Sequence, residues 1–355
     1  METYRKISKE NLKKWLTGLK TQAEVLVPAK ENSLWTYRNF DGQDFPRSFQ
    51  NSRLPPKGLF LESLKALFEW KSSNGSLQVH PPAASDGQRV IFGLRACDAR
   101  ALKIIEPVFA GDCPDVFYLR NLSRTLLLGL ACHVQCDGSF CGEMGIDPRD
   151  STDFDIFFRE IPEGYIARVV TEKGQALTGG GGLFEEAAAG EWNLTRGKIR
   201  GGREKPLFNL ERVTAGVVER FPDENLWQRI SAKCISCGIC TYLCPTCHCF
   251  DLGDLQTRGQ GARFRCWDSC AFADFTKMAV HNPREEKWRR YRQRVSHKFN
   301  YFTQNFQTIA CVGCGQRILK IPECGLPAAS IATERGVVVH VNDLWLPLVS
   351  THIHD

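Results

Sequence analysis

The chain has 355 residues, 43% of them hydrophobic, which is enough for two or three domains with packed cores. Its 46 basic and 40 acidic residues leave a formal net charge of +6, and much of the excess lies between Arg284 and Lys298. No stretch reaches the ~18 apolar residues of a membrane span, and the N-terminus lacks the apolar segment of a secretory signal. We therefore expect a cytoplasmic protein whose 16 cysteines stay reduced.

Two patterns in the first half of the chain predict ordinary secondary structure. Residues 8 to 20 carry apolar side chains at helical spacing, and they begin with Ser8, a residue type that often caps a helix. Residues 153 to 161 and 165 to 171 alternate like strands around Pro162-Glu163-Gly164, which predicts a hairpin. We expect these elements to serve packing rather than chemistry.

Two apolar runs end at cysteines. The run from Arg89 to Leu94 is followed by Cys97, and the run from Thr125 to Ala131 is followed by Cys132, with Cys136 and Cys141 soon after. Both runs have the composition of buried strands. Because ligand sites in open α/β sheets lie beyond the carboxyl ends of the strands, we expect these thiols to meet at one edge of a sheet.

The most specific motif is the run C-x2-C-x2-C-x3-C-P, the bacterial ferredoxin pattern for a [4Fe-4S] cluster. Its cysteines are Cys234, Cys237, Cys240 and Cys244. The first three recur at a spacing that one tight turn can aim at three irons, with Gly238 relieving backbone crowding. In two-cluster ferredoxins the fourth cysteine binds the other cluster, so Cys244 predicts a second half-motif elsewhere in the chain.

A second half-motif begins at Cys311-Val-Gly-Cys314 and then departs from the pattern. Arg317 and Ile321 stand where its third and fourth cysteines belong, and Cys324 is the nearest remaining thiol. We therefore expect two [4Fe-4S] clusters, the second of them incomplete unless Cys324 supplies a ligand. The residues between the half-motifs, 245 to 310, are expected to be helical.

Several segments together resemble the iron-sulfur β subunit of sulfhydrogenases and the A subunit of anaerobic sulfite reductase. These segments are residues 93–102, 234–251, 265–270, 281–283, 292–298 and 311–314. The resemblance implies a dicluster protein with an α-helical ferredoxin domain. It also implies a relay between a flavin-containing NAD(P)H-oxidising partner and a catalytic hydrogenase or reductase subunit. The likeness ends near residue 315, where an altered reading frame or true divergence are the two explanations.

The same resemblance implies a further cluster in the N-terminal part of the chain. Family members carry cysteines at the positions of Cys97, Cys132, residue 139 and Cys141, but here residue 139 is Ser139. Cys136 is the candidate substitute from the adjacent turn. The alternative is that these are ordinary buried thiols, because isolated cysteines often act as small core hydrophobes.

The fold class that we predict is α+β, with a mixed α/β domain at residues 1–225, an α-helical ferredoxin domain at 226–325 and a divergent tail at 326–355. The predicted function is electron transfer within an oxidoreductase complex, without nucleic acid or membrane contact, and the basic stretch from Arg284 to Lys298 is the candidate docking surface for a partner. One alternative is a catalytic cluster with an open iron at the missing ligands. Another is a zinc-stabilised interaction module.

Overall fold

The computed structural model describes residues 2–31, 34–43, 49–52, 54–73, 76–82, 87–136, 138–202, 206 and 208–315. The described residues form two compact units. The first lies within Met1–Pro56, Asp86–Leu207 and Val312–Gln316, and the second within Lys57–Ser85, Phe208–Cys311 and Arg317–Asp355. The sequence predicts one continuous domain over residues 1–225 and another over 226–325. Both compact units are discontinuous, and each takes a segment from the stretch that this prediction gives to the other.

The first unit is built on an eight-stranded mixed sheet. Its strands, in spatial order, are β10 (Glu185–Ala187), β1 (Thr3–Ser8), β9 (Gly164–Val169), β8 (Ile156–Ile161), β7 (Thr125–Leu130), β6 (Gln88–Leu94), β2 (Ala23–Glu31) and β3 (Leu34–Asn39). The four strands β2, β6, β7 and β8 run parallel, and antiparallel strands flank them on both sides. The predicted hairpin is confirmed as β8 and β9. The mixed α/β character predicted for this part of the chain is also confirmed.

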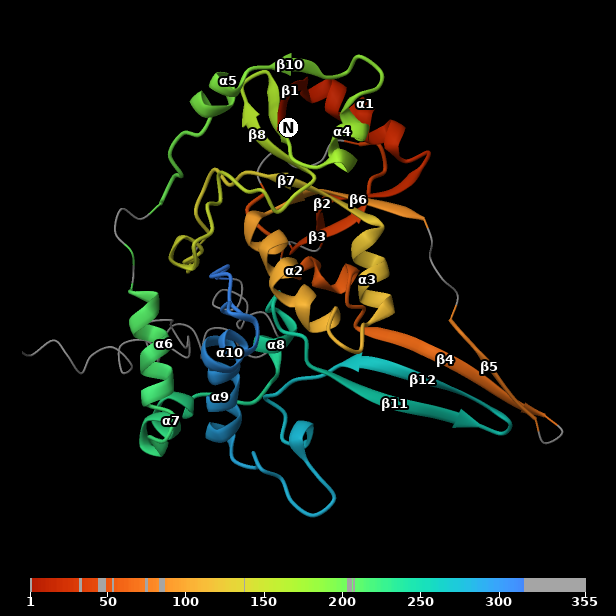
Figure 1. Ribbon diagram of the computed structural model, residues 1–355, viewed down its shortest axis with the longest axis vertical. Helices are drawn as coiled ribbons and strands as arrows, with labels where there is room; N and C mark the ends of the chain where they lie inside the picture. The colour runs from red at the N-terminus through yellow and green to blue at the C-terminus, as the bar shows by residue number, and fades with distance from the viewer. Residues whose placement is uncertain are drawn as a thin grey trace, which may run out of the picture. The chain divides into compact units, whose positions relative to one another are not determined.

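Helices cover this sheet. They are α1 (Lys9–Leu19), α2 (Ala96–Phe109), α3 (Val116–Ser123), α4 (Glu172–Thr178) and α5 (Ala189–Leu194). The predicted first helix is confirmed, because the Ser8 side chain caps α1 by accepting a hydrogen bond from the Asn11 N–H, while Leu12 and Trp15 are buried in the core. Helices α2 and α3 pack on each other and against β7 (Figure 1).

The second unit combines helices with a four-stranded antiparallel sheet. Its strands, in spatial order, are β11 (Phe250–Thr257), β12 (Gln260–Trp267), β4 (Leu64–Ser73) and β5 (Ser76–His80). Its longer helices are α6 (Leu210–Glu219), α7 (Glu224–Ser231) and α9 (Lys287–Ser296), and its short ones are α8 (Ile239–Tyr242), the π-helix η4 (His297–Tyr301) and α10 (Phe302–Phe306). A core that includes Val217, Trp227, Trp288 and Tyr291 joins α6, α7 and α9.

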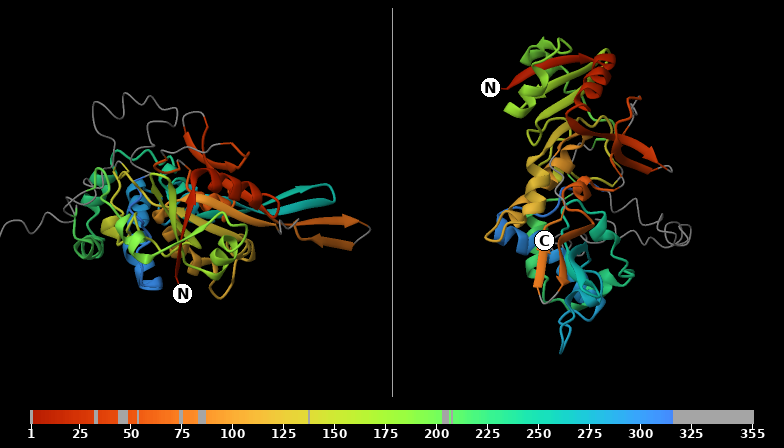
Figure 2. Two further views of the ribbon diagram at one scale, coloured as in Figure 1. Left: turned by 90° about the horizontal axis from the view of Figure 1, so that it is seen from above. Right: turned by 90° about the vertical axis from the view of Figure 1, so that its right-hand side faces the viewer.

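The expectation of a helical segment between the two half-motifs is wrong for residues 250 to 267. They form the hairpin β11–β12, in which Thr257 pairs with Gln260 around a two-residue turn. Gly259 adopts φ +71°, which suits a tight hairpin turn and which other residues rarely adopt. The hairpin pairs with β4 of the β4–β5 hairpin, and Figure 2 shows the two hairpins from further sides. An entirely α-helical ferredoxin domain is therefore not confirmed.

Candidate metal centres

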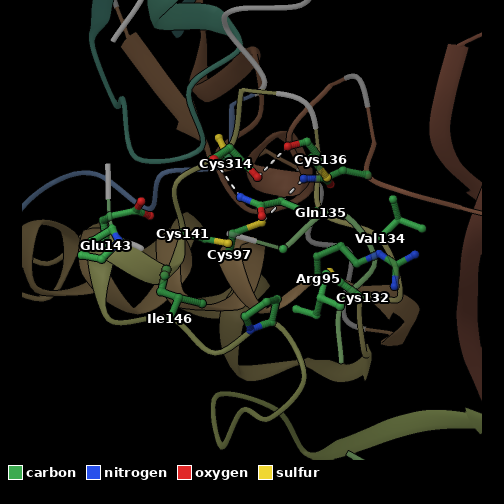
Figure 3. Close-up of a pocket in the computed structure, with 17 residues that line it drawn as sticks. Arg95, Cys97, Cys132, Val134, Gln135, Cys136, Cys141, Glu143, Ile146 and Cys314 are labelled. Carbon is green, nitrogen blue, oxygen red and sulfur yellow. Dashed lines mark hydrogen bonds between the residues drawn. The ribbon is translucent and has the colours of Figure 1, made fainter. Parts of the chain in front are cut away.

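Cys97 and Cys132 follow two neighbouring parallel strands of the first unit. Cys97 lies in the first turn of α2, directly after β6, and Cys132 lies just beyond β7. Both line a cavity of about 330 Å³ together with Cys136, Cys141 and Cys314 (Figure 3). The predicted meeting of the strand-end thiols is thus confirmed as a structural fact. Their use as metal ligands stays a prediction.

Cys314 reaches this cavity through a backbone contact. The Phe140 N–H donates a hydrogen bond to the Gly313 carbonyl at 2.7 Å. Gly313 has φ +58°, and a Cβ atom there would lie 2.5 Å from the Phe140 carbonyl oxygen, so only glycine permits this approach. The ferredoxin pattern predicts that Cys314 binds the same cluster as Cys244. The pattern gave no sign that the segment docks on residues 136 to 141.

Ser139, which stands where family members carry a cysteine, holds the cavity loop together. Its hydroxyl donates to the Cys136 carbonyl at 2.7 Å, and the side chain is buried. Four thiols of residues 97 to 141 and that of Cys314 nevertheless line the cavity. The replacement at position 139 therefore leaves more than the four thiolates that a cubane cluster requires.

The cavity surroundings favour neutral thiols. Burial raises the pKa of Cys97 and Cys132, and it raises the pKa of Cys136 to about 12 and that of Cys141 to about 11. Metal binding requires thiolates and displaces the thiol protons. The five thiols that line the cavity, once deprotonated, are soft sulfur donors of the kind that hold iron-sulfur clusters. The residues present thus fit such a group.

In the second unit the ferredoxin run folds as a loop that leads into α8. Ser236 and Gly238 both have positive φ, at 57° and 75°. The Ser236 N–H donates to the Cys234 sulfur at 3.4 Å, the kind of contact that supports a cluster-binding thiolate. A Cβ atom on Gly238 would lie 2.6 Å from the Phe272 ring, so a glycine is needed here to fit this side chain, while its predicted role beside the cluster stays a prediction.

A buried lysine touches the fourth cysteine of the motif. The Lys298 ammonium donates to the Cys244 sulfur at 3.2 Å, to the Thr246 hydroxyl at 2.9 Å and to the Ala310 carbonyl at 2.8 Å. Cys244 also shares a hydrogen bond with Cys247, which lowers its pKa, and Lys298 lowers that pKa further. Cys244 is therefore the thiol of this pair that is held as a thiolate.

Two more cations lie against the same segment. Arg294 donates to the Cys247 sulfur at 3.2 Å and to the Cys240 carbonyl at 2.7 Å. Lys57 donates to the carbonyls of Thr241 and Cys247 at 2.9 and 2.8 Å. All three cations are buried. Buried positive charge beside cysteines is costly unless negative charge balances it, so this segment also fits thiolate-bound clusters.

The basic stretch predicted as a docking surface therefore faces inward in part. Arg290, Arg294 and Lys298 are at most 8% exposed. Arg290 donates to the carbonyls of Ala271 and Arg284. Sequence reasoning treated the whole stretch as one charged face, but its arginines occupy two faces of the helix. Arg289 is one of the partly exposed members, and it forms an ion pair with Glu286 at 2.7 Å.

A second cysteine pair lies at the base of the β11–β12 hairpin. Cys249 and Cys270 share a hydrogen bond, which lowers the pKa of Cys270. They line a cavity of about 300 Å³ with His248 and His297. Burial lowers the pKa of each of these histidines to about 4, so both are neutral at pH 7. The ferredoxin pattern does not use this pair, and the sequence assigned it no definite role.

Cys311 packs against the helical core of the second unit, and its thiol contributes to the electrostatic surroundings of Lys298. Cys324, Arg317 and Ile321 lie outside the described residues, as does the tail from residue 326. Within the described residues, no group of three or more His, Cys, Asp or Glu side chains could hold a metal ion. The ligands of a cubane cluster bind four separate irons, whereas those of a structural zinc site converge on one ion.

Residues 233–324 match the family model of the 4Fe-4S dicluster domain. This stretch is thus similar to an iron-sulfur domain, and it contains both half-motifs, at Cys234 and Cys311. The chain is also 28% identical over 326 residues to sulfhydrogenase 2 subunit beta of Pyrococcus furiosus, a match that covers 88% of this chain and 92% of the relative. The predicted resemblance to the sulfhydrogenase β subunit and the predicted dicluster character are confirmed, whereas the likeness to the sulfite reductase subunit stays a prediction. No solved structure matches the chain.

Among the residues that the structure describes, no helix is both long enough and apolar enough to cross a bilayer.

Proposed function

We propose that this protein is an iron-sulfur electron-transfer subunit of a cytoplasmic, multi-subunit oxidoreductase of the hydrogenase or sulfite reductase type. In this role it relays electrons between a flavin-containing NAD(P)H-oxidising subunit and a catalytic subunit. The observation that carries the proposal is the dicluster-domain match over residues 233–324, within which buried cations contact the motif cysteines. The similarity to a sulfhydrogenase β subunit supports the type of complex.

We assign three groups of ligands. Cys234, Cys237 and Cys240 would bind one cluster, and Cys244 with Cys311 would bind the second, with Cys314 or Cys324 as further candidate ligands. The third group lines the cavity of the first unit and consists of Cys97, Cys132 and Cys141, with Cys136 or Cys314 as the fourth ligand. Bound [4Fe-4S] clusters supply one-electron redox chemistry, so the chain needs no acid, base or nucleophile of its own.

The protein's own residues would control how that chemistry proceeds. The buried cations Lys298, Arg294 and Lys57 would offset the negative charge of cluster and thiolates. The Ser236 N–H reduces the charge density on the Cys234 sulfur through its hydrogen bond. Each of these contacts affects the potential at which an electron enters or leaves.

The proposal is tested by anaerobic purification followed by iron, sulfide and zinc analysis of the full chain. We expect eight to twelve irons per chain, because two or three clusters carry about four irons each. Equal amounts of acid-labile sulfide and a broad visible absorption should accompany them. Zinc in place of iron, with no visible absorption, would contradict the relay and support an interaction module.

A further inference from the structure

Three cations on one helical segment are buried at regular intervals. Arg290, Arg294 and Lys298 lie four residues apart on α9 and η4, and each is at most 8% exposed. Side chains at this spacing share one face of a helix. Arg294 and Lys298 donate directly to cysteine sulfurs, at 3.2 Å in both contacts. Lys298 thus contacts the sulfur of the proposed ligand Cys244, whereas Arg294 reaches the proposed ligand Cys240 through its backbone carbonyl.

Lys298 joins the segments of the two half-motifs. An ammonium has three N–H donors, and Lys298 uses them on Cys244, Thr246 and Ala310. Ala310 directly precedes Cys311, the first cysteine of the second half-motif. The Thr246 hydroxyl donates to the same Ala310 carbonyl at 2.7 Å. Three hydrogen bonds thus fix the Lys298 ammonium between Cys244 and the residue that precedes Cys311.

The charge on Lys298 is maintained despite its burial. All three N–H donors of its ammonium have acceptors, namely the Cys244 sulfur, the Thr246 hydroxyl and the Ala310 carbonyl, which is the condition under which a buried charge is tolerated. Bulk counter-ions screen a buried charge only weakly. Reduction adds one negative charge to a bound cluster, and a fixed cation nearby stabilises the reduced form more than the oxidised form.

We propose that Lys298 is a positioning residue whose charge raises the reduction potential of the cluster bound through Cys244. This inference rests on the proposed function, because it requires a cluster at that site. Lys298 contacts the ligand sulfur and not a substrate, so its effect is on the energy of the transferred electron. Arg294 acts in the same sense on the neighbouring Cys247 and Cys240.

The test compares three variants of the full chain in an EPR-monitored redox titration. Lys298→Met removes the charge and keeps the length of the side chain, whereas Lys298→Arg keeps the charge. Arg289→Gln is the matched control, because it removes one positive charge from the partly exposed side of the same helix. Iron content is measured on every preparation before the titration.

We expect Lys298→Met to retain its iron and to weaken reduction of one cluster at least tenfold, which corresponds to a fall of 59 mV for a one-electron couple. Lys298→Arg and Arg289→Gln should change the equilibrium less than twofold. Loss of the cluster from either Lys298 variant would overturn the inference, because it would make Lys298 a residue needed for cluster binding. An unchanged potential in Lys298→Met at full iron content would overturn it as well. Wild-type protein without iron would instead refute the proposed function.

Discussion

The two thiol-rich regions of this protein present cysteine sulfurs in different electrostatic surroundings. In the first unit, the charged side chains that line the cavity among the described residues are Arg95 and Glu143, whose charges cancel. The sulfur of Cys97 accepts a hydrogen bond from the neutral amide of Asn51 at 3.6 Å. In the second unit, the charged side chains of Lys298 and Arg294 donate hydrogen bonds to cysteine sulfurs, so a positive charge lies beside each of these sulfurs.

This difference bears on how one chain can hold clusters of unequal potential. Ligand type alone does not set a cluster's potential, because charge, burial and hydrogen bonds to sulfur shift it strongly. A cluster in the first cavity would meet no net positive charge from the lining side chains. A cluster bound through Cys244 would meet at least Lys298. We therefore expect the first site to be the more difficult to reduce.

The largest expected effect is loss of whole clusters. Cys237→Ser should remove about four irons from the second unit, and Cys132→Ser should remove about four from the first. The double variant should lose both sets, because the ligands belong to separate sites. Cys113→Ser is the matched control, since Cys113 is exposed and belongs to no proposed site. Iron analysis and EPR of the reduced protein measure each loss. Unchanged iron content in Cys132→Ser would show that the thiols lining the cavity of the first unit bind no cluster and are ordinary core residues.

A smaller effect separates the two sites by potential. In a redox titration of the wild type, the signal absent from Cys132→Ser should be at least tenfold harder to reduce than the signal absent from Cys244→Ser. For one electron that is a difference of 59 mV or more. The physical reason is the positive charge beside Cys244. Equal potentials, or the reverse order, would show that the contrast in side-chain charge does not control these clusters.

Cys314 is a candidate ligand at both sites. The ferredoxin pattern assigns it to the cluster of Cys244, whereas its side chain lines the cavity of the first unit. We expect Cys314→Ser to alter the same EPR signal as Cys132→Ser, with Cys136 able to keep part of the iron in place. If Cys314→Ser alters only the EPR signal that Cys244→Ser removes, Cys314 is instead a ligand of the cluster bound through Cys244.

The smallest effect concerns docking of a partner. Arg290 is buried and bonded to carbonyl oxygens, so its replacement would test folding rather than docking. Arg289→Glu changes charge on the partly exposed side of α9 and should slow electron delivery from the partner a few-fold at low salt. The effect should fade as the Debye length shrinks from ~10 Å at 0.1 M toward ~3 Å at 1 M. Stopped-flow rates that match the wild type at every salt concentration would leave the exposed arginine as a solvated residue.

Much of the candidate site could be predicted from the sequence because its signals are local. The spacing of Cys234, Cys237 and Cys240 is a property of one turn, and the family match confirms the iron-sulfur character of that stretch. Cys97 and Cys132 each follow a strand of buried composition. Parallel neighbours bring the ends of such strands to one edge, so their meeting followed from short-range patterns.

The tertiary structure alone decided the features that depend on contacts between distant segments. The pairing of β4 with β12 joins residues that are far apart in the chain, and no local pattern reports it. The place of Cys314 depends on the approach of Gly313 to Phe140. Whether Lys298 meets solvent or the Cys244 sulfur depends on which face of the helix packs inward, because a charge run reads the same in either case. The sequence by itself determines that cysteine thiols are available to bind iron. Contacts between distant segments determine which cationic side chains lie next to which of these thiols.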